Sequence, residues 1–382
     1  MYKIMTVFGT RPEAIKLAPV IKELQRYPDT LKSIVTVTAQ HRQMLDSVLG
    51  VFSIKPDHDL DIMRANQGLS DITCKVLKDI EAIYESEKPD MILVQGDTTT
   101  VFAASLAAYY KQIPVGHVEA GLRSHDKYHP FPEEVNRCLT SVIAYLHFAP
   151  THAAKANLLK EGIAESAICV TGNTVIDALL EVASRAFTFD NDALNGIKGK
   201  MVLITAHRRE SFGKPFSDMC NAILVLARRY PEVTFVYPVH LNPNVRNTVF
   251  PILGNAPNVI LIEPLEYVPF VHLMKKACII LTDSGGIQEE APSLHKPVLI
   301  LREVTERPEV VHAGGAKLVG TNPDAIIAET SRLLEDVEEY NRMSHIPNPF
   351  GDGHAARRIV DFIRNTFVND KNTGGLRSHA SK

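Results

Sequence analysis

The 382-residue sequence lacks the features that mark membrane and secreted proteins. No apolar run approaches the ~18–20 residues that a helix needs to span a bilayer. The first residues, Met1-Tyr2-Lys3-Ile4, are typical of the start of a strand and not of a signal peptide. The net charge is −3 and no tract or half of the chain is basic, which argues against nucleic acid. We therefore expect a soluble, cytoplasmic protein without a membrane or nucleic-acid partner.

Metal-binding and common cofactor signatures are also missing. The five cysteines are scattered, with no Cys-x-x-Cys pair and no metal-ligand spacing, and we expect reduced core residues at Cys74, Cys138, Cys169, Cys220 and Cys278. There is no Gly-x-x-x-x-Gly-Lys phosphate loop, no Gly-x-Gly-x-x-Gly fingerprint and no Ser or Cys nucleophile motif. We predict no metal and no cofactor.

Length and pattern indicate two α/β domains. The chain is too long for one typical core, and 45% hydrophobic with 22% charged residues is typical of a globular protein. Strand and helix patterns alternate from end to end, which predicts parallel sheets. We expect a first domain over residues 1–172, a second over 173–354, a last helix at about 355–367, and a disordered tail over 368–382.

One stretch, Ile279–Pro292, has the pattern of an anion site. A buried strand leads into Asp283-Ser284-Gly285-Gly286 and then into a helix. Ser284 can cap that helix, and the glycines let a phosphate approach the amide N–H groups. Glu290, about two turns into the helix, could accept both hydroxyls of a ribose. An ordinary strand–turn–helix joint explains the two glycines alone about equally well.

Polar residues follow most of the predicted strands, where ligands bind in open parallel sheets. In the first half they are Arg11, Glu13, Gln40, His41, Asp97 and Glu119; in the second they are His207, Arg208, His240, Glu263, Ser284 and Arg307. Glu133 opens a helix beside the same edge. Each alone could be a helix cap or a solvated surface residue. Their shared position favours an interdomain ligand cleft with an acidic part and a basic part.

The two parts suit different chemistry. Two or three carboxylates in one pocket cannot all ionise cheaply, so one can act as a general acid while another stays a base. On the basic side, Arg11, His207 and Arg307 could clamp a diphosphate and stabilise charge as it departs.

Six segments together form a specific pattern. They are Gly9-Thr10-Arg11-Pro12-Glu13 with Lys16, Gln95-Gly96-Asp97, His117-Val118-Glu119-Ala120-Gly121-Leu122-Arg123, Phe131-Pro132-Glu133-Glu134 with Asn136 and Arg137, Thr205-Ala206-His207-Arg208-Arg209-Glu210, and Asp283-Ser284-Gly285-Gly286-Ile287-Gln288-Glu289-Glu290. In this order and spacing, up to about residue 367, the chain resembles the non-hydrolysing UDP-N-acetylglucosamine 2-epimerases of bacteria.

The resemblance implies a GT-B fold, with two Rossmann-like doubly wound domains around an active site and a C-terminal helix that crosses back onto the first. It implies reversible conversion of UDP-N-acetylglucosamine to UDP-N-acetylmannosamine without an external cofactor. In that family, loss of the C2 proton expels UDP and leaves 2-acetamidoglucal, and UDP adds back after reprotonation from the other face. A homodimer, activation by substrate at an adjacent site, and a role in cell-wall polysaccharide or capsule synthesis are implied as well.

The resemblance also assigns residues, motif by motif. The acid/base candidates are Asp97, Glu119 and Glu133, with His207 and Arg11 at the diphosphate and leaving group. The other substrate-binding candidates are Lys16, Phe270, Ser284, Gly285, Gly286, Glu290 and Arg307. The activating site matches Gln40, His41, Gln43, Gln67, Glu134, Arg137, Arg208 and His240, which could equally be further contacts of the first site.

Three other functions compete with this interpretation. A hydrolysing epimerase would share the fold and release UDP with free N-acetylmannosamine. A GT-B glycosyltransferase would need an acceptor site, and three carboxylates are more than that transfer needs. A non-catalytic UDP-sugar sensor would leave the carboxylates without a task.

Overall fold

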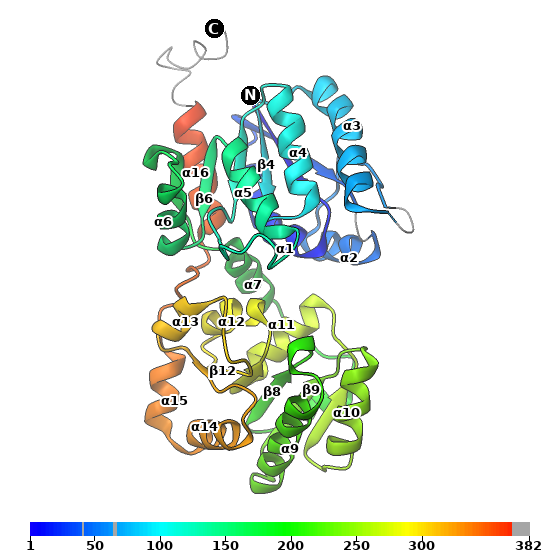
Figure 1. Cartoon of the computed structure of the whole chain (residues 1–382), viewed down its shortest axis with the longest axis vertical. Coiled ribbons are helices and arrows are strands. Elements are labelled where there is room, and N and C mark those ends of the chain that lie inside the picture. Colours follow the sequence, from blue (N-terminus) through cyan, green and yellow to red (C-terminus); the bar gives the residue numbers. More distant parts are fainter. Residues whose placement is uncertain (40–41, 64–66, 369–382) are drawn as a thin grey trace. The chain divides into compact units, whose positions relative to one another are not determined.

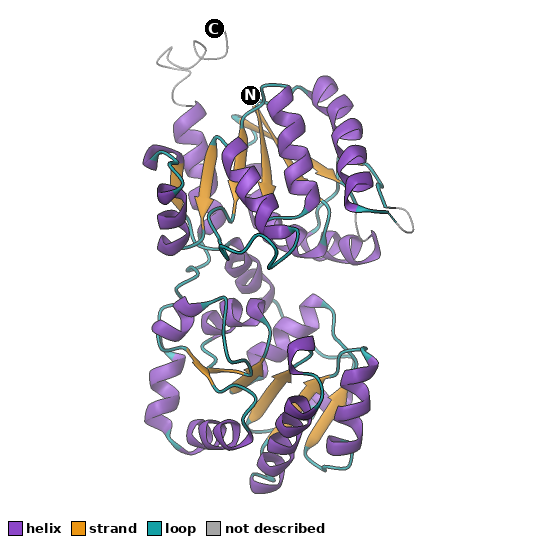
Figure 2. Cartoon of the chain, viewed as in Figure 1, coloured by secondary structure: helices purple, strands orange, loops and turns teal. Residues whose placement is uncertain are grey.

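The computed structural model describes residues 1–39, 42–63 and 67–368. The chain divides into two compact units, Met1–Ala178 with Phe350–Lys382, and Leu179–Pro349. In each unit a parallel sheet lies between layers of helices (Figure 2), which confirms the expected α/β class. The change of unit falls inside helix α7 (Thr174–Ala183), which starts just after residues 172 and 173.

The first unit is built on a seven-stranded sheet with the order β3-β2-β1-β4-β5-β6-β7. All of its pairings are parallel. The central strand β4 is an almost wholly apolar, buried run because helices cover both faces of the sheet. The strands are β1 (Tyr2–Phe8), β2 (Leu31–Val37), β3 (His58–Asp59), β4 (Met91–Gln95), β5 (Val115–Val118), β6 (Leu146–Ala149) and β7 (Ile168–Val170).

The helices of this unit are labelled in Figure 1, and a capping threonine precedes two of them. The hydroxyls of Thr98 and Thr151 accept N–H bonds at the starts of α4 and α6. The helices are α1 (Arg11–Gln25), α2 (Arg42–Phe52), α3 (Leu69–Glu87), α4 (Thr99–Tyr110), α5 (Glu133–Ile143), α6 (His152–Lys160), α7 and α16 (Ala355–Ile363), with a 3-10 turn at Glu165–Ala167.

Helix α16 returns to the first unit from the far end of the sequence and packs against α1. It buries one apolar side, including Ile359, Val360 and Ile363, and Asp177 accepts the N–H groups of Ala355 and Ala356 at 3.1 and 2.9 Å. The α-helix ends at Ile363 and continues directly as a π-helical turn over Arg364–Val368, so helical structure extends through the predicted range of about 355–367.

The second unit repeats the plan with a six-stranded parallel sheet of order β10-β9-β8-β11-β12-β13. The strands are β8 (Met201–Thr205), β9 (Thr234–Pro238), β10 (Val259–Ile262), β11 (Ile279–Thr282), β12 (Val298–Ile300) and β13 (Ala316–Leu318). The helices are α8 (Asp192–Asn195), α9 (Lys214–Arg229), α10 (Pro243–Leu253), α11 (Tyr267–Lys276), α12 (Gly285–Glu290), α13 (Pro308–His312), α14 (Pro323–Glu335) and α15 (Val337–Ser344), with 3-10 turns at Arg209–Ser211 and Ala291–Leu294.

The strand order locates the candidate site in each unit. In the first sheet the order reverses between β1 and β4, and in the second between β8 and β11. Ligands of open α/β sheets bind where the order reverses, outside the carboxyl ends of the strands.

Among the described residues, none of the helices combines the length and the apolar character that a membrane-spanning helix needs.

Candidate functional site

In the first unit, the loops after β1 and β4 are joined by the carboxylate of Glu13. Its Oε2 accepts the N–H groups of Gly9 and Thr10 at 2.9 and 2.7 Å, and its Oε1 accepts the hydroxyl of Thr98 at 2.6 Å. Glu13 is 2% exposed, and burial raises the pKa of its carboxyl group although these hydrogen bonds oppose the shift. Glu13 therefore organises the loops that carry Arg11 and Asp97, with no open face for a ligand.

Asp97 lies in the turn after β4 and is held from several sides. Its carboxylate pairs with Arg137, and its backbone carbonyl accepts the side-chain amide of Asn136 at 3.0 Å. The carbonyl of Gly96 lies 2.7 Å from Nε2 of His117, a buried residue of β5. Burial lowers the pKa of His117 to about 3, so it stays neutral and donates from Nε2. The Asp97 side chain remains 28% exposed against 14% for Arg137.

Glu119 follows β5, the strand beside β4, and adopts a positive φ of 65°. Its Oε2 lies 2.5 Å from both Nζ of Lys16 and the side-chain amide nitrogen of Gln95. The three predicted site residues Asp97, Glu119 and Lys16 thus come together at neighbouring strand ends, and Arg11 opens the same helix as Lys16. Both acids are carboxylates stabilised by a cation.

The two glutamates at the start of α5 have different surroundings. Glu133 is half-buried, and within the described part of the chain its side chain has no hydrogen bond or ion pair. Glu134 is 3% exposed and accepts the N–H groups of Ser124 and His125 at 3.0 Å each. It also lies 3.2 Å from Arg137. Glu134 therefore anchors the loop after β5, while Glu133 keeps its carboxylate available.

Part of the suggested activating site cannot be placed. Gln40 and His41 lie outside the described residues, as does the side chain of Gln43 in α2. Gln67 is half-buried just before α3.

In the second unit, Asp283 joins the ends of β8 and β11. These strands pair with Thr282 opposite Thr205, and the two threonine hydroxyls lie 2.6 Å apart. One step further, Oδ2 of Asp283 accepts the N–H groups of His207 and Arg208 at 2.6 and 2.7 Å. Asp283 was not among the predicted site residues, although it follows a buried strand just as Asp97 follows β4.

His207 sits above this carboxylate with a side chain that is 40% exposed. Its Nδ1 lies 3.3 Å from Oδ1 of Asp283, and its ring stacks on His240 with centroids 5.2 Å apart. Burial lowers the pKa of His207, Asp283 opposes that shift, and His240 and Arg208 add to it. His207 is therefore a neutral imidazole near pH 7, close to a carboxylate that favours its protonated form.

The Ser-Gly-Gly turn differs from expectation in two details. Ser284 is the N-cap residue of α12 but its side chain makes no capping bond; its own N–H donates to Thr282 Oγ1 at 3.0 Å. Helix α12 has six residues, so Glu290 at its end lies less than two turns from the start. A Cβ atom at Gly285 or Gly286 would meet no described atom within 4 Å. The space above both glycines is open.

Arg307 is fixed to α12 by its ion pair with Glu289, which is 3% exposed at the side chain. Thr305 steadies the same loop, because its hydroxyl donates to Gln288 Oε1 at 2.5 Å and accepts the N–H of Arg307 at 3.0 Å. Phe270 is half-buried on α11.

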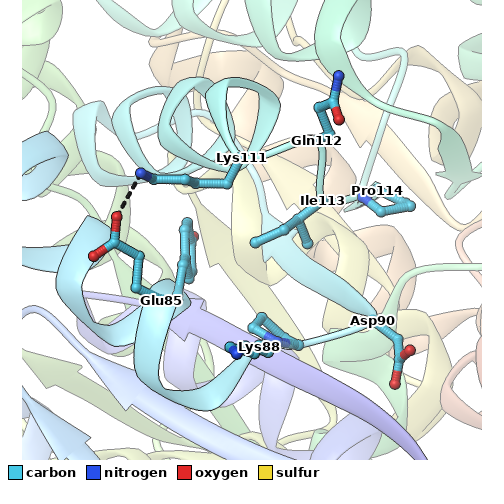
Figure 3. Close-up of a pocket in the computed structure, with 9 residues that line it drawn as sticks. Glu85, Lys88, Asp90, Lys111, Gln112, Ile113 and Pro114 are labelled. Carbon is cyan, nitrogen blue, oxygen red and sulfur yellow. Dashed lines mark hydrogen bonds and ion pairs between the residues drawn. The ribbon is translucent and has the colours of Figure 1, made fainter. Parts of the chain in front are cut away.

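The first unit also has a cavity of about 550 Å³ that lies away from Asp97 and Glu119 (Figure 3). It is lined by residues just before β4 and β5, including Lys88 and Asp90, with Lys111 bonded to Glu85 at 2.7 Å. It thus lies at the amino ends of strands whose carboxyl ends carry Asp97 and Glu119, and it is separate from the candidate site.

Comparisons with known proteins give a consistent result. A family model described as UDP-N-acetylglucosamine 2-epimerase matches residues 22–364. The UDP-N-acetylglucosamine 2-epimerase of Escherichia coli strain K12 is 54% identical over 374 residues, which cover 96% of this chain and 99% of that protein. The crystal structure of UDP-GlcNAc 2-epimerase from Neisseria meningitidis bound to UDP-GlcNAc has a TM-score of 0.83 and 53% identity, and covers 95% of this chain and 100% of that one. UDP-GlcNAc 2-epimerase from Methanocaldococcus jannaschii has a TM-score of 0.82 at 35% identity, with 95% and 99% covered.

These similarities extend over nearly the whole chain, and the predicted GT-B type fold is confirmed with them. Because a family model and relatives more than half identical match both units, the chain belongs to the UDP-N-acetylglucosamine 2-epimerase family, whose members are isomerases.

Proposed function

We propose that the protein interconverts UDP-N-acetylglucosamine and UDP-N-acetylmannosamine by the non-hydrolysing route. The observation that carries this proposal is the pair of cation-held carboxylates, Asp97 with Arg137 and Glu119 with Lys16, at neighbouring strand ends. Epimerisation at C2 needs a proton removed from one face and another delivered to the opposite face, and fixed carboxylates suit that task.

The reaction we propose balances as an elimination followed by an addition. A carboxylate takes the C2 proton, the C–H electrons form the C1=C2 bond of 2-acetamidoglucal, and the C1–O electrons leave with UDP. A second acid then protonates C2 from the other face while UDP re-forms the C1–O bond. Asp97, Glu119 and Glu133 supply the proton traffic in this scheme, and which of them removes the C2 proton stays open.

The second unit is proposed to hold the nucleotide. Gly285 and Gly286 are needed neither for a positive φ nor for packing against the described chain, so their lack of a side chain favours a ligand there. His207, Arg11 and Arg307 would stabilise charge on the diphosphate, Glu290 would bind the ribose, and Lys16, Phe270 and Ser284 would complete the contacts.

Substrate activation is proposed through Arg137. This side chain contacts both Asp97 and Glu134, so a ligand that moves Glu134 or Arg137 would change the surroundings of Asp97. Arg208 and His240 would take part through their contacts with Asp283 and His207. The roles of Gln40, His41, Gln43 and Gln67 stay predictions. An activator acts only if it binds one state of the enzyme better than another.

A homodimer is also part of the proposal. Helix α5 exposes Val135, Leu139 and Val142 by 39%, 41% and 81%, at the spacing of one helix side, and Tyr145 follows at 47%. Such an apolar stripe favours a partner surface. The cytoplasmic location and the role in cell-wall polysaccharide or capsule synthesis stay predictions from the family resemblance.

Proton NMR of UDP-N-acetylglucosamine with the protein in D₂O tests the reaction. We expect UDP-N-acetylmannosamine with deuterium at C2 and no accumulation of free UDP. Steady release of UDP with free N-acetylmannosamine would instead assign a hydrolysing epimerase. Absence of deuterium exchange would overturn the epimerase proposal and direct attention to a glycosyl acceptor.

A further inference from the structure

Asp283 uses its two carboxylate oxygens for different purposes. Oδ2 is fully occupied by the N–H groups of His207 and Arg208. Oδ1 is buried, has no hydrogen bond within the described structure, and has Nδ1 of His207 at 3.3 Å. The residue as a whole is 1% exposed, so water does not offer Oδ1 an easy alternative.

This contact decides between the two neutral forms of the His207 ring. A carboxylate oxygen only accepts, so a proton on Nδ1 gives Oδ1 the donor it lacks. A proton on Nε2 would place the Nδ1 lone pair against that oxygen and leave a buried charge unsatisfied. The distance of 3.3 Å between Nδ1 and Oδ1 is that of a long hydrogen bond, and bonds between catalytic groups commonly shorten when a substrate binds.

The other groups around His207 do not compete for Nδ1. The ring of His240 lies parallel to it at an interplanar angle of 10°, and Nδ1 of His240 already accepts the N–H of Asn242 at 3.1 Å. Arg208 contributes its backbone N–H to Asp283. Tyr237, below the loop, donates its hydroxyl to the carbonyl of Ala206 at 2.5 Å. Asp283 is thus the acceptor that faces Nδ1.

We propose that Asp283 is a positioning residue that keeps the proton of neutral His207 on Nδ1 and thereby leaves Nε2 as the atom that exchanges a proton with the leaving diphosphate. The second half of this statement rests on the function proposed above, and the first half does not. In the elimination, a His207 ring that has taken up a proton from solvent on Nε2 donates it to a phosphate oxygen as UDP departs. The ring is left in the neutral Nδ1–H form, and Nε2 takes the same proton back when UDP adds again.

The tautomer can be read directly in the unmodified protein. The chain has 15 histidines, so the His207 signals are identified by their loss in His207→Asn after uniform ¹⁵N labelling. Long-range ¹H–¹⁵N correlation at a pH where His207 is neutral distinguishes a proton on Nδ1 from one on Nε2. We expect the Nδ1–H form; a predominant Nε2–H form in the wild-type protein would overturn the proposal without any variant of Asp283.

Asp283→Asn separates positioning from loop structure. The asparagine oxygen can still accept the N–H groups of His207 and Arg208, while its amide now donates toward Nδ1 and forces the proton onto Nε2. We expect the tautomer to switch, kcat to fall by about 10²-fold or more, and the Kd of UDP to change less than about threefold. Glu339→Gln is the matched control, because it removes a buried carboxylate of the same unit, 2.7 Å from Arg342, and should leave the His207 signals unchanged.

The outcomes separate the two proposals. A folded Asp283→Asn protein whose His207 keeps its proton on Nδ1 contradicts the role of Asp283. A switched tautomer with undiminished turnover supports Asp283 as the group that sets the ring and rejects His207 as an acid for the diphosphate.

Discussion

The two units differ in the carboxylate that follows the fourth strand of each sheet. In the first, Asp97 follows β4, and its side chain is 28% exposed and pairs with Arg137, which is 14% exposed. In the second, Asp283 follows β11, and its side chain is 2% exposed and lies against His207, which is 40% exposed. The same strand position thus presents an acid in the first unit and a basic imidazole in the second. The elimination that we propose uses both groups, since a proton moves at C2 and an anion leaves C1.

The largest expected effect tests the acids of the first unit. Asp97→Asn, Glu119→Gln and Glu133→Gln should each lower turnover by roughly 10²-fold or more, because an amide cannot take a proton from C2. UDP binding, measured by calorimetry, should stay nearly intact if the nucleotide belongs to the second unit.

Glu165→Gln is the control for these three changes. Its carboxylate pairs with Lys155 at 2.6 Å in the same unit but is 72% exposed and away from the site, so turnover should not change. Normal turnover in all three site variants would remove the acid/base assignment.

A smaller effect tests the nucleotide role of the second unit. Glu290→Ala should weaken UDP binding about tenfold, because the variant loses the hydrogen bonds that the ribose hydroxyls would donate to the charged carboxylate. Glu329→Ala, which breaks an ion pair with Lys317 on the same unit, serves as the comparison. Equal UDP affinity in the Glu290 variant and the wild type would rule out the ribose role.

The smallest effect concerns buried histidines of the first sheet. His147 of β6 lies opposite His117 of β5, and burial lowers the pKa of His147 from 6.5 to about 4. Between pH 6.5 and pH 4, His147 is protonated in the unfolded chain but stays neutral in the folded chain. The free energy of unfolding therefore falls as the pH drops through this range, by up to about 1.4 kcal/mol per pH unit. The urea concentration at the midpoint of unfolding should fall between pH 7 and pH 5, and His147→Gln should make this fall smaller. An unchanged loss would mean that other groups control acid sensitivity.

Many elements could be predicted because each depends on neighbouring residues. Helix α4 starts at Thr99, directly after the capping residue Thr98, and strand β10 coincides with the apolar run Val259–Ile262; both signals lie in neighbouring residues. The polar residues that follow the strands could be predicted for the same reason, because the end of an apolar run is visible in the local sequence. The predicted Ser284 cap was wrong, because its side chain makes no capping bond; its backbone N–H donates to the hydroxyl of Thr282.

The sequence by itself determined the α/β class, the strand ends that carry polar residues, and, through its motifs, the family. The tertiary structure decided which polar residues meet. Lys16 and Glu119 are 103 positions apart, and Asp283 is 76 from His207; each pair forms because particular strands became neighbours. Which strands become neighbours depends on how whole helices pack on both faces of the sheet, and a short stretch of sequence does not predict that packing. The contact of Asp283 with His207 and the bond from Thr98 to Glu13 therefore formed only when the sheets were assembled.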